Sequence, residues 1–116
     1  MGDDTPLQIL KEAINAFVGE GDWERFHKPT NLVSSIAIGA SELLEIFQWE
    51  EKSREQIKSD VTSKKCMEEE LADVIIYCLS LANVLEIDGS SSVLSKIEKN
   101  ETKYPDLINL SKSKDI

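Results

Sequence analysis

The sequence predicts an all-α protein, most simply a four-helix bundle. Apolar residues recur at helical spacing in four segments, glycine and proline separate these segments, and no segment alternates apolar and polar residues as a half-buried strand does. A chain of 116 residues has the size of one domain. We therefore expect a single domain over residues 1–116, with a helical core at about 7–105 and a loose polar tail at 106–116.

The charge balance limits the partners that this chain is expected to bind. Its formal net charge is −9, so a nucleic-acid polymer or an anionic membrane surface is disfavoured. A small anion that arrives with a divalent cation stays compatible with this charge. Cys66 and Cys78 do not form a disulfide framework or a CxxC pair, and no apolar run approaches the length of a membrane span. These features predict free thiols and a cytoplasmic location.

The first helix has a clear start signal. We expect Thr5 as its N-cap, Pro6 at its first position and Gln8 completing a capping box. Gly19 and Gly21 are expected to end it. Its apolar stripe consists of Leu7, Leu10, Ile14, Phe17 and Val18.

The second helix follows a short aromatic segment, residues 22–29, which breakers bound and which we expect to be a loop or a single turn. Thr30 is the expected cap, and the helix is expected to run to about Glu50. The charged stretch from Glu50 to Thr62 is expected to be a mobile connection with room for one helical turn. The core stripe of the second helix consists of Leu32, Ile36, Ala40, Leu43 and Phe47.

The third helix is expected from Ser63 to about Ile87. Its middle, residues 74–82, is apolar almost all the way round. A helix on the surface of a monomer would not show this pattern. We therefore expect it to be the central helix of the bundle, or to be covered in part by another subunit.

The last helix begins after the break at Asp88 and Gly89, with Ser90 or Ser91 as its expected cap. It is expected to continue through about Lys103. The Tyr104–Pro105 pair then stops it, because the residue before a proline disfavours the helical conformation.

Two stretches of the middle helices carry nearly the same polar pattern. At helical spacing, each places two carboxylates and one aromatic ring on one face. If the helices are antiparallel and these faces meet, the crowded carboxylates need a cation between them, and oxygen ligands suit Mg²⁺ or Mn²⁺. The rings would then lie one turn beyond the metal, where a flat base could stack. The residues are Glu42, Glu45 and Trp49 in the first stretch and Glu70, Asp73 and Tyr77 in the second.

Simpler interpretations remain open for these residues. The carboxylates fit two solvated helix faces as well, since an acidic chain produces the ExxE spacing by chance, as Glu98 and Glu101 do. Aromatic residues at helical spacing usually pack in a core or an interface. The spacing therefore predicts a metal-dependent nucleotide site only together with the residues that flank it.

The flanking residues resemble a known family. Residues 22–32 read DWERFHKPTNL, residues 41–49 read SELLEIFQW, and residues 69–77 read EELADVIIY. Together they resemble the MazG-like all-α nucleotide pyrophosphohydrolases, and most of all the dCTP pyrophosphatase branch. The likeness extends over about residues 7–105.

This resemblance implies an enzyme and assigns roles to its residues. It implies hydrolysis of a nucleoside triphosphate, dCTP or a related or modified pyrimidine deoxynucleotide, to the monophosphate and pyrophosphate by a homodimer or homotetramer. It implies Mg²⁺ ligands at Glu42, Glu45, Glu70 and Asp73, with Glu45 also a candidate general base. It implies base and sugar contacts at Trp23, His27, Trp49 and Tyr77. Candidates to hold the phosphates are Lys96, Asn100 and Lys103.

The chain departs from this family at Gly39. In relatives of the branch, the position three residues before the one matched by Glu42 is usually a glutamate that serves as a metal ligand. A glycine has no side-chain oxygen and weakens the helix by about 1 kcal/mol relative to alanine. The chain has therefore lost a ligand, moved the first pair to Glu42 and Glu45, or become a nucleotide-binding or helical interaction module without catalysis.

Overall fold

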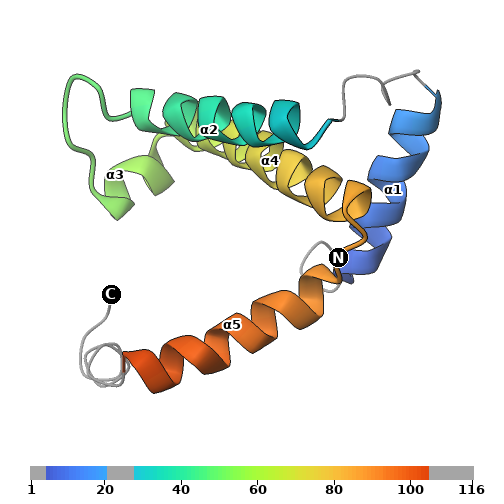
Figure 1. Cartoon of the computed structure of the whole chain (residues 1–116). Helices are drawn as coiled ribbons and strands as arrows, with labels where there is room; N and C mark the ends of the chain where they lie inside the picture. The colour runs from blue at the N-terminus through green and yellow to red at the C-terminus, as the bar shows by residue number, and fades with distance from the viewer. Residues whose placement is uncertain (1–4, 21–27, 105–116) are drawn as a thin grey trace. The chain divides into compact units, whose positions relative to one another are not determined.

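The computed structural model describes residues 5–20 and 28–104, and these residues are helical with no strand among them. Four long helices and one short one follow in order, so the all-α prediction is confirmed (Figure 1). They are α1 (Leu7–Glu20), α2 (Pro29–Glu45), α3 (Arg54–Ser59), α4 (Val61–Val84) and α5 (Gly89–Lys103). The chain divides into two compact units, residues 1–86 and 87–116, and each is described by itself.

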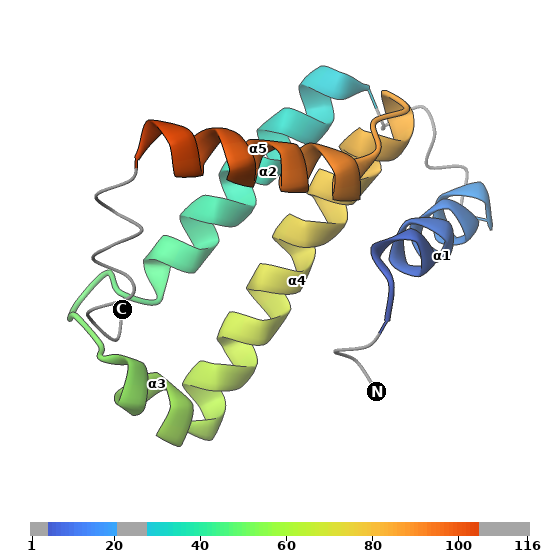
Figure 2. The ribbon, with the colours of Figure 1, turned by 90° about the horizontal axis from the view of Figure 1, so that it is seen from below.

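The helix α4 is the centre of the first unit, as its apolar middle predicts. It packs along α2 for much of its length and also contacts α1 and α3. Figures 1 and 2 show α2 and α4 side by side and antiparallel. Leu32 of α2 and Leu79 and Ala82 of α4 are buried. This antiparallel pair is the arrangement that the two acidic faces require to meet.

The helix α4 begins two residues earlier than predicted, at Val61 rather than Ser63. The Asp60 carboxylate accepts hydrogen bonds from the backbone N–H groups of Thr62 and Ser63, at 3.0 and 3.3 Å, and from the Ser63 hydroxyl at 3.0 Å. The pKa of Asp60 lies below its usual value, and the main causes are the hydrogen bonds from the backbone and the side chain of Ser63. Helix α4 therefore begins at Val61, because Asp60 satisfies N–H groups that have no partner inside the helix.

The helix α2 is shorter than predicted at its C-terminal end. Pro29 occupies its first turn and Lys28 flanks it, so the prediction of Thr30 as its cap was wrong. After Glu45 the chain tightens, since the Gln48 N–H donates to the Glu45 carbonyl three residues back. Trp49 therefore lies beyond the helix, and placing it on the helical face of Glu42 and Glu45 was wrong.

The connection between α2 and α4 was predicted to have room for one helical turn, and it contains the six-residue helix α3. Ser53 and Gln56 form a complete capping box at the start of α3: each side chain bonds to the other's backbone N–H, at 3.2 and 2.7 Å.

Three further helix ends also differ from the prediction. Gly19 lies inside α1, which continues to Glu20, and Gly21 lies outside the described residues. Asp88, rather than a serine, caps α5, because its carboxylate accepts from the Ser91 N–H at 3.0 Å. Helix α4 ends at Val84 rather than Ile87, and Glu86 just beyond it has a positive φ of 55°. None of the described helices is both long and apolar enough to span a bilayer.

Candidate metal and nucleotide site

Gly39 sets the close approach of α2 to α4. It is buried, and a Cβ atom built on it would lie 2.9 Å from Val74 Cγ2 and 4.0 Å from Val74 Cα. Val74 directly follows Asp73, and Gly39 lies one turn before Glu42 on α2. Gly39 supplies no oxygen to bind a metal, but the absence of its side chain lets α2 and α4 pack closely beside the candidate site.

Carboxylates from both helices meet next to this contact. Glu42 and Glu45 of α2 and Glu70 of α4 line one surface pocket, together with Ile46 and Cys66. The carboxyl groups of Glu42 and Glu70 are within hydrogen-bonding reach of each other across the helix pair. The antiparallel register thus brings together three of the four carboxylates that the spacing predicts to meet.

The electrostatics of this pocket are concentrated on Glu70. Its pKa is raised, first by a hydrogen bond with the Glu42 carboxyl, then by burial and by the negative charges of Glu42, Asp73 and Glu69. Its Oε2 atom is buried and has no hydrogen-bond partner among the described residues. A carboxylate in this position gains a compensating interaction when it binds either a proton or a cation.

The donor set fits a hard divalent cation. Every oxygen donor of the pocket is a carboxylate, which suits Mg²⁺ or Mn²⁺, and the buried Oε2 atom of Glu70 is a donor without a partner. Within the described residues, no three His, Cys, Asp or Glu side chains already converge closely enough to hold an ion. Asp73 does not line the pocket, although its charge acts on Glu70. Closing a coordination shell here would therefore require carboxylate side chains to turn.

The predicted aromatic contacts fall in three different places. Tyr77 lies on α4, two turns beyond Glu70, and is half-buried. Trp49 is 88% exposed and lies after the end of α2, so it is not core packing. Trp23 and His27 lie outside the described residues. Their predicted roles as base and sugar contacts stay predictions.

Comparison with known proteins decides the family. The model of the MazG-like family matches residues 34–115, which include all of α4 and the part of α2 that carries Glu42 and Glu45. This chain belongs to the MazG-like family. The family resemblance inferred from the flanking residues is therefore confirmed.

Relatives of this MazG-like chain include mammalian enzymes. It is 35% identical over 100 residues to dCTP pyrophosphatase 1 of Rattus norvegicus and 37% identical over 101 residues to that of Bos taurus. Each alignment covers 85% of this chain and 59% of the relative, so the chain spans less than two thirds of these proteins. The crystal structure of a pyrophosphatase from Archaeoglobus fulgidus matches with a TM-score of 0.76 and 43% identity. This match covers 85% of this chain and 92% of the archaeal one.

The predicted phosphate-binding residues of this MazG-like chain lie on α5, in the second unit. Lys96, Asn100 and Lys103 are all exposed on this helix. The Lys103 ammonium lies over the Tyr104 ring, 5.2 Å from its centroid. Contact of these residues with phosphates stays a prediction.

The other two residues of the carboxylate pocket, Cys66 and Ile46, were not predicted from the sequence. Cys66 lies one helical turn before Glu70, so the spacing alone places it near that carboxylate. Ile46 directly follows Glu45 at the end of α2. Both positions were available from the periodicity, but only the pairing of α2 with α4 places them in one pocket with Glu42.

Proposed function

We propose that this chain is a metal-dependent nucleoside triphosphate pyrophosphohydrolase that acts on dCTP or a related or modified pyrimidine deoxynucleotide. The observation that carries the proposal is the meeting of Glu42 and Glu70 across α2 and α4, with Glu45 in the same pocket. The relatives support the same chemistry, since they are dCTP pyrophosphatases and an archaeal pyrophosphatase.

In the proposed reaction, water attacks the α-phosphorus and the bond between the α-phosphorus and the bridging oxygen breaks. The products are the nucleoside monophosphate and pyrophosphate. Glu42, Glu70 and Asp73 would hold the cation, and Glu45 would either complete its shell or accept the proton of the attacking water. When bound, Mg²⁺ or Mn²⁺ would neutralise negative charge on the phosphates and lower the pKa of the attacking water.

The remaining roles concern binding and assembly. Trp23, His27, Trp49 and Tyr77 contact base and sugar, where ring stacking contributes about 1–3 kcal/mol per base in comparable sites. Lys96, Asn100 and Lys103 hold the phosphates. The working form is a homodimer or homotetramer, and its location is cytoplasmic.

Pyrophosphate release from a panel of natural and modified deoxynucleoside triphosphates with Mg²⁺ tests this proposal. We expect turnover, highest with a pyrimidine, and a loss of at least 100-fold in Glu70→Gln, because the amide does not supply the negative charge that a bound cation needs. Absence of turnover from every nucleotide at high protein concentration, with Mg²⁺ and with Mn²⁺, contradicts the proposed activity.

The second candidate function is a nucleotide-binding or helical interaction module without catalysis, and buried Gly39 is the observation that favours it. In that case nucleotides bind without turnover, and Gly39→Glu switches hydrolysis on. Gly39→Gln is the matched control, because it adds the same bulk against Val74 without the charge. If Gly39→Glu and Gly39→Gln have the same metal affinity and the same rate, position 39 has no part in coordination.

A further inference from the structure

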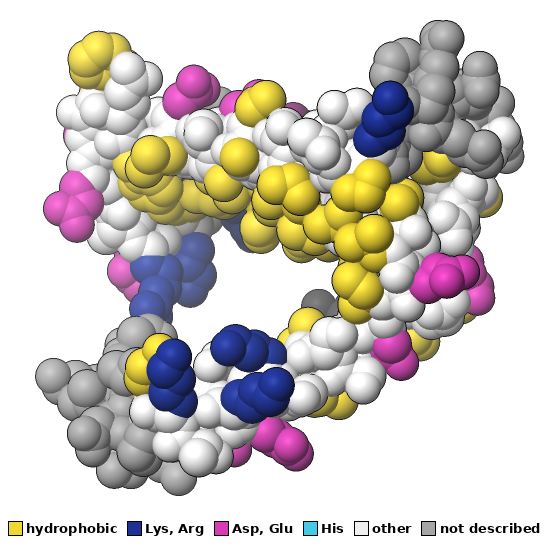
Figure 3. Space-filling view, viewed as in Figure 1, with side chains coloured by type: hydrophobic (Ala, Val, Ile, Leu, Met, Phe, Trp, Pro, Cys, Tyr) yellow, Lys and Arg dark blue, Asp and Glu magenta, His cyan; other side chains and the backbone are white. Residues whose placement is uncertain are grey.

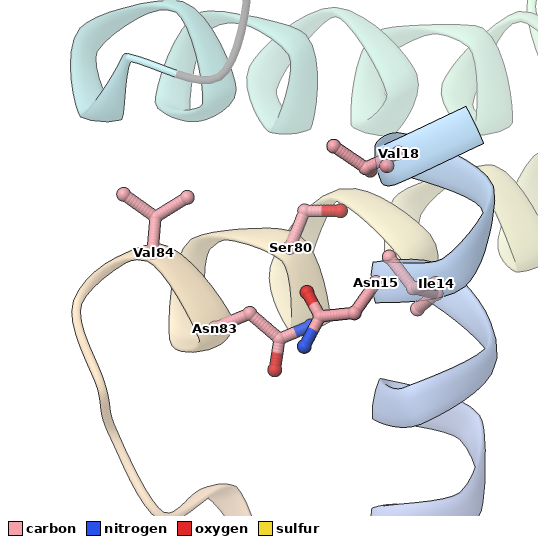
Figure 4. Close-up of a pocket in the computed structure, with 7 residues that line it drawn as sticks. Ile14, Asn15, Val18, Ser80, Asn83 and Val84 are labelled. Atoms are coloured by element: carbon pink, nitrogen blue, oxygen red, sulfur yellow. The ribbon is translucent and has the colours of Figure 1, made fainter. Parts of the chain in front are cut away.

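A second cavity lies between α1 and α4, at the end of α4 remote from Cys66 and Glu70. Its volume is about 430 Å³, within the range of small-molecule pockets. Figure 4 shows its walls, with side chains from α1 on one side and from α4 on the other. The described residues that line it are Ile14, Asn15, Val18, Gly19, Ser80, Asn83 and Val84.

The chemistry of this cavity is the opposite of that of the carboxylate pocket. None of its described lining residues is ionisable: the side chains are aliphatic, apart from two amides and one hydroxyl. Ser80 is only 3% exposed. Asn83 Nδ2 donates to the Lys11 carbonyl at 3.2 Å, which orients this amide and leaves Oδ1 as its atom able to accept a bond from a ligand. The Asn15 and Asn83 amides point toward one another in Figure 4. Such a lining suits an uncharged flat ring whose edge carries donors and acceptors.

The position of the cavity relates it to the carboxylates. Glu70, Asp73, Tyr77 and Ser80 follow one another at spacings of three, four and three residues, so they lie on one stripe of α4. Asp73 and Ser80 are seven residues apart, a rise of about 10 Å along the helix. A nucleotide with its phosphates at the carboxylates and its sugar beside Tyr77 would reach the cavity with its base.

We propose that this cavity is the base-reading subsite, and that the Asn15 amide, with Ser80 and Asn83, determines which nucleobase is accepted. The inference rests on the proposed hydrolysis of nucleoside triphosphates. It adds three polar residues to the expected aromatic contacts, and it assigns the choice of base to neutral hydrogen bonds. Asn15 is the residue to test because it is exposed, whereas Asn83 also ties α4 to α1.

The first test compares kcat/KM for the four common deoxynucleoside triphosphates in wild type, Asn15→Leu and Gln8→Leu. Leucine keeps the branching of asparagine at Cγ but has no hydrogen-bonding atom. Gln8 is a matched control, since it is an exposed amide on the same helix that donates to Glu12 Oε1 and does not line the cavity. We expect Asn15→Leu to reduce the preference for the best base about tenfold, as the loss of one or two base contacts does, and Gln8→Leu to leave it unchanged. An unchanged preference in a folded Asn15→Leu protein overturns the assignment.

The second test does not depend on hydrolysis. Free deoxynucleosides are added to the metal-free protein, and the side-chain amide signals of Asn15 and Asn83 are followed by NMR. Shifts of both signals that saturate with a nucleoside in wild type and in Gln8→Leu, together with loss of the Asn83 shift in Asn15→Leu, support the subsite even if no triphosphate is hydrolysed. Unmoved amide signals at millimolar nucleoside overturn it, even if pyrophosphate is released.

Discussion

At the scale of single residues, Glu70 affects both the stability of the fold and the proposed binding of a metal ion. Its carboxyl faces that of Glu42, and its Oε2 atom has no hydrogen-bond partner among the described residues. Both features disfavour the ionised form in the absence of a cation. The same features make a bound divalent cation stabilising, because it removes the repulsion and supplies the missing partner.

The first prediction concerns the pH dependence of stability in the metal-free protein. Because the pKa of Glu70 is raised in the folded state, the protonated Glu70 side chain stabilises the fold. This stabilisation is fully present below the ordinary glutamate pKa of about 4.3 and is lost as pH rises through the raised pKa. We expect Glu70→Gln to unfold at a higher temperature than wild type at pH 7, and the difference to shrink as pH falls toward 4. Thermal unfolding followed by circular dichroism across this range measures it.

The same variant tests the metal assignment. Millimolar Mg²⁺ or Mn²⁺ should raise the unfolding temperature of wild type and leave that of Glu70→Gln unchanged. An equal metal-induced shift in both proteins would show that Glu70 is not a ligand.

Glu86 is the second residue at which local conformation predicts an outcome. Its φ of 55° at the end of α4 is a conformation that glycine adopts without the steric cost of a Cβ atom. We expect Glu86→Gly to raise the free energy of unfolding by about 1 kcal/mol, measured by urea unfolding. The substitution removes this steric cost, and it also removes a negative charge from a helix C-terminus. Glu86→Ala is the control, since it removes the charge and keeps the Cβ atom. Equal stabilities of the two variants would exclude the backbone explanation.

At the scale of helices, the pairing of α2 with α4 depends on the contact between Gly39 and Val74. Gly39→Ala gains about 1 kcal/mol of helix propensity, whereas overpacking a well-packed contact costs about 1–3 kcal/mol. With Val74 Cγ2 only 2.9 Å from the new Cβ atom, we expect a net loss of about 1 kcal/mol.

A double-mutant cycle in urea isolates this contact. In a Val74→Ala background the close contact is gone, so Gly39→Ala should become neutral or stabilising. If Gly39→Ala changes the free energy of unfolding equally in both backgrounds, Val74 is not what Gly39 accommodates.

The cap of α4 provides the other prediction at this scale. Asp60 has a lowered pKa, so its stabilisation is present above the ordinary aspartate pKa of about 3.9 and is lost as pH falls through the lowered value. Asp60→Ala should therefore lower the unfolding temperature at pH 7, and the deficit should narrow in acid. Asp60→Asn keeps a capping oxygen, so we expect it to lose less. An Asn variant as unstable as the Ala variant would contradict capping as the main role.

At the scale of the whole molecule, the described chain leaves large apolar side chains exposed. Figure 3 shows hydrophobic side chains gathered over α4, and Leu71 and Ile75, one turn apart on it, are 46% and 43% exposed. Contiguous apolar surface of this kind is typical of an interface. It supports the proposed homo-oligomer, since association of two copies would cover it.

Ile75→Lys tests this surface. We expect light scattering after size exclusion to give wild type the mass of a dimer or a tetramer of the 13.0 kDa chain. We expect Ile75→Lys to weaken this association at least tenfold. Ser34→Lys adds the same charge at an exposed polar position of α2, and it should associate as wild type does. A wild-type protein that is monomeric at high micromolar concentration would contradict the proposed assembly.

The sequence by itself determined the helices and the acidic faces of this protein. The features that predict them are local properties of the chain: the period of the apolar residues, the helix-breaking residues, and the spacing of Glu42, Glu45, Glu70 and Asp73. It located several helix ends only to within a few residues, since carboxylates such as Asp60 competed with the expected caps. It also carried the family motifs, although it did not place them in space.

Only the tertiary structure decided which of these residues meet. The pairing of α2 with α4 joins Glu42 to Glu70 and explains Gly39 as a packing residue, where the sequence showed only a missing ligand. The packing of α1 on α4 likewise places Asn15 beside Asn83. Such contacts depend on the register between helices far apart in the chain, and a register is set by how side chains fit across the interface rather than by the period of either helix.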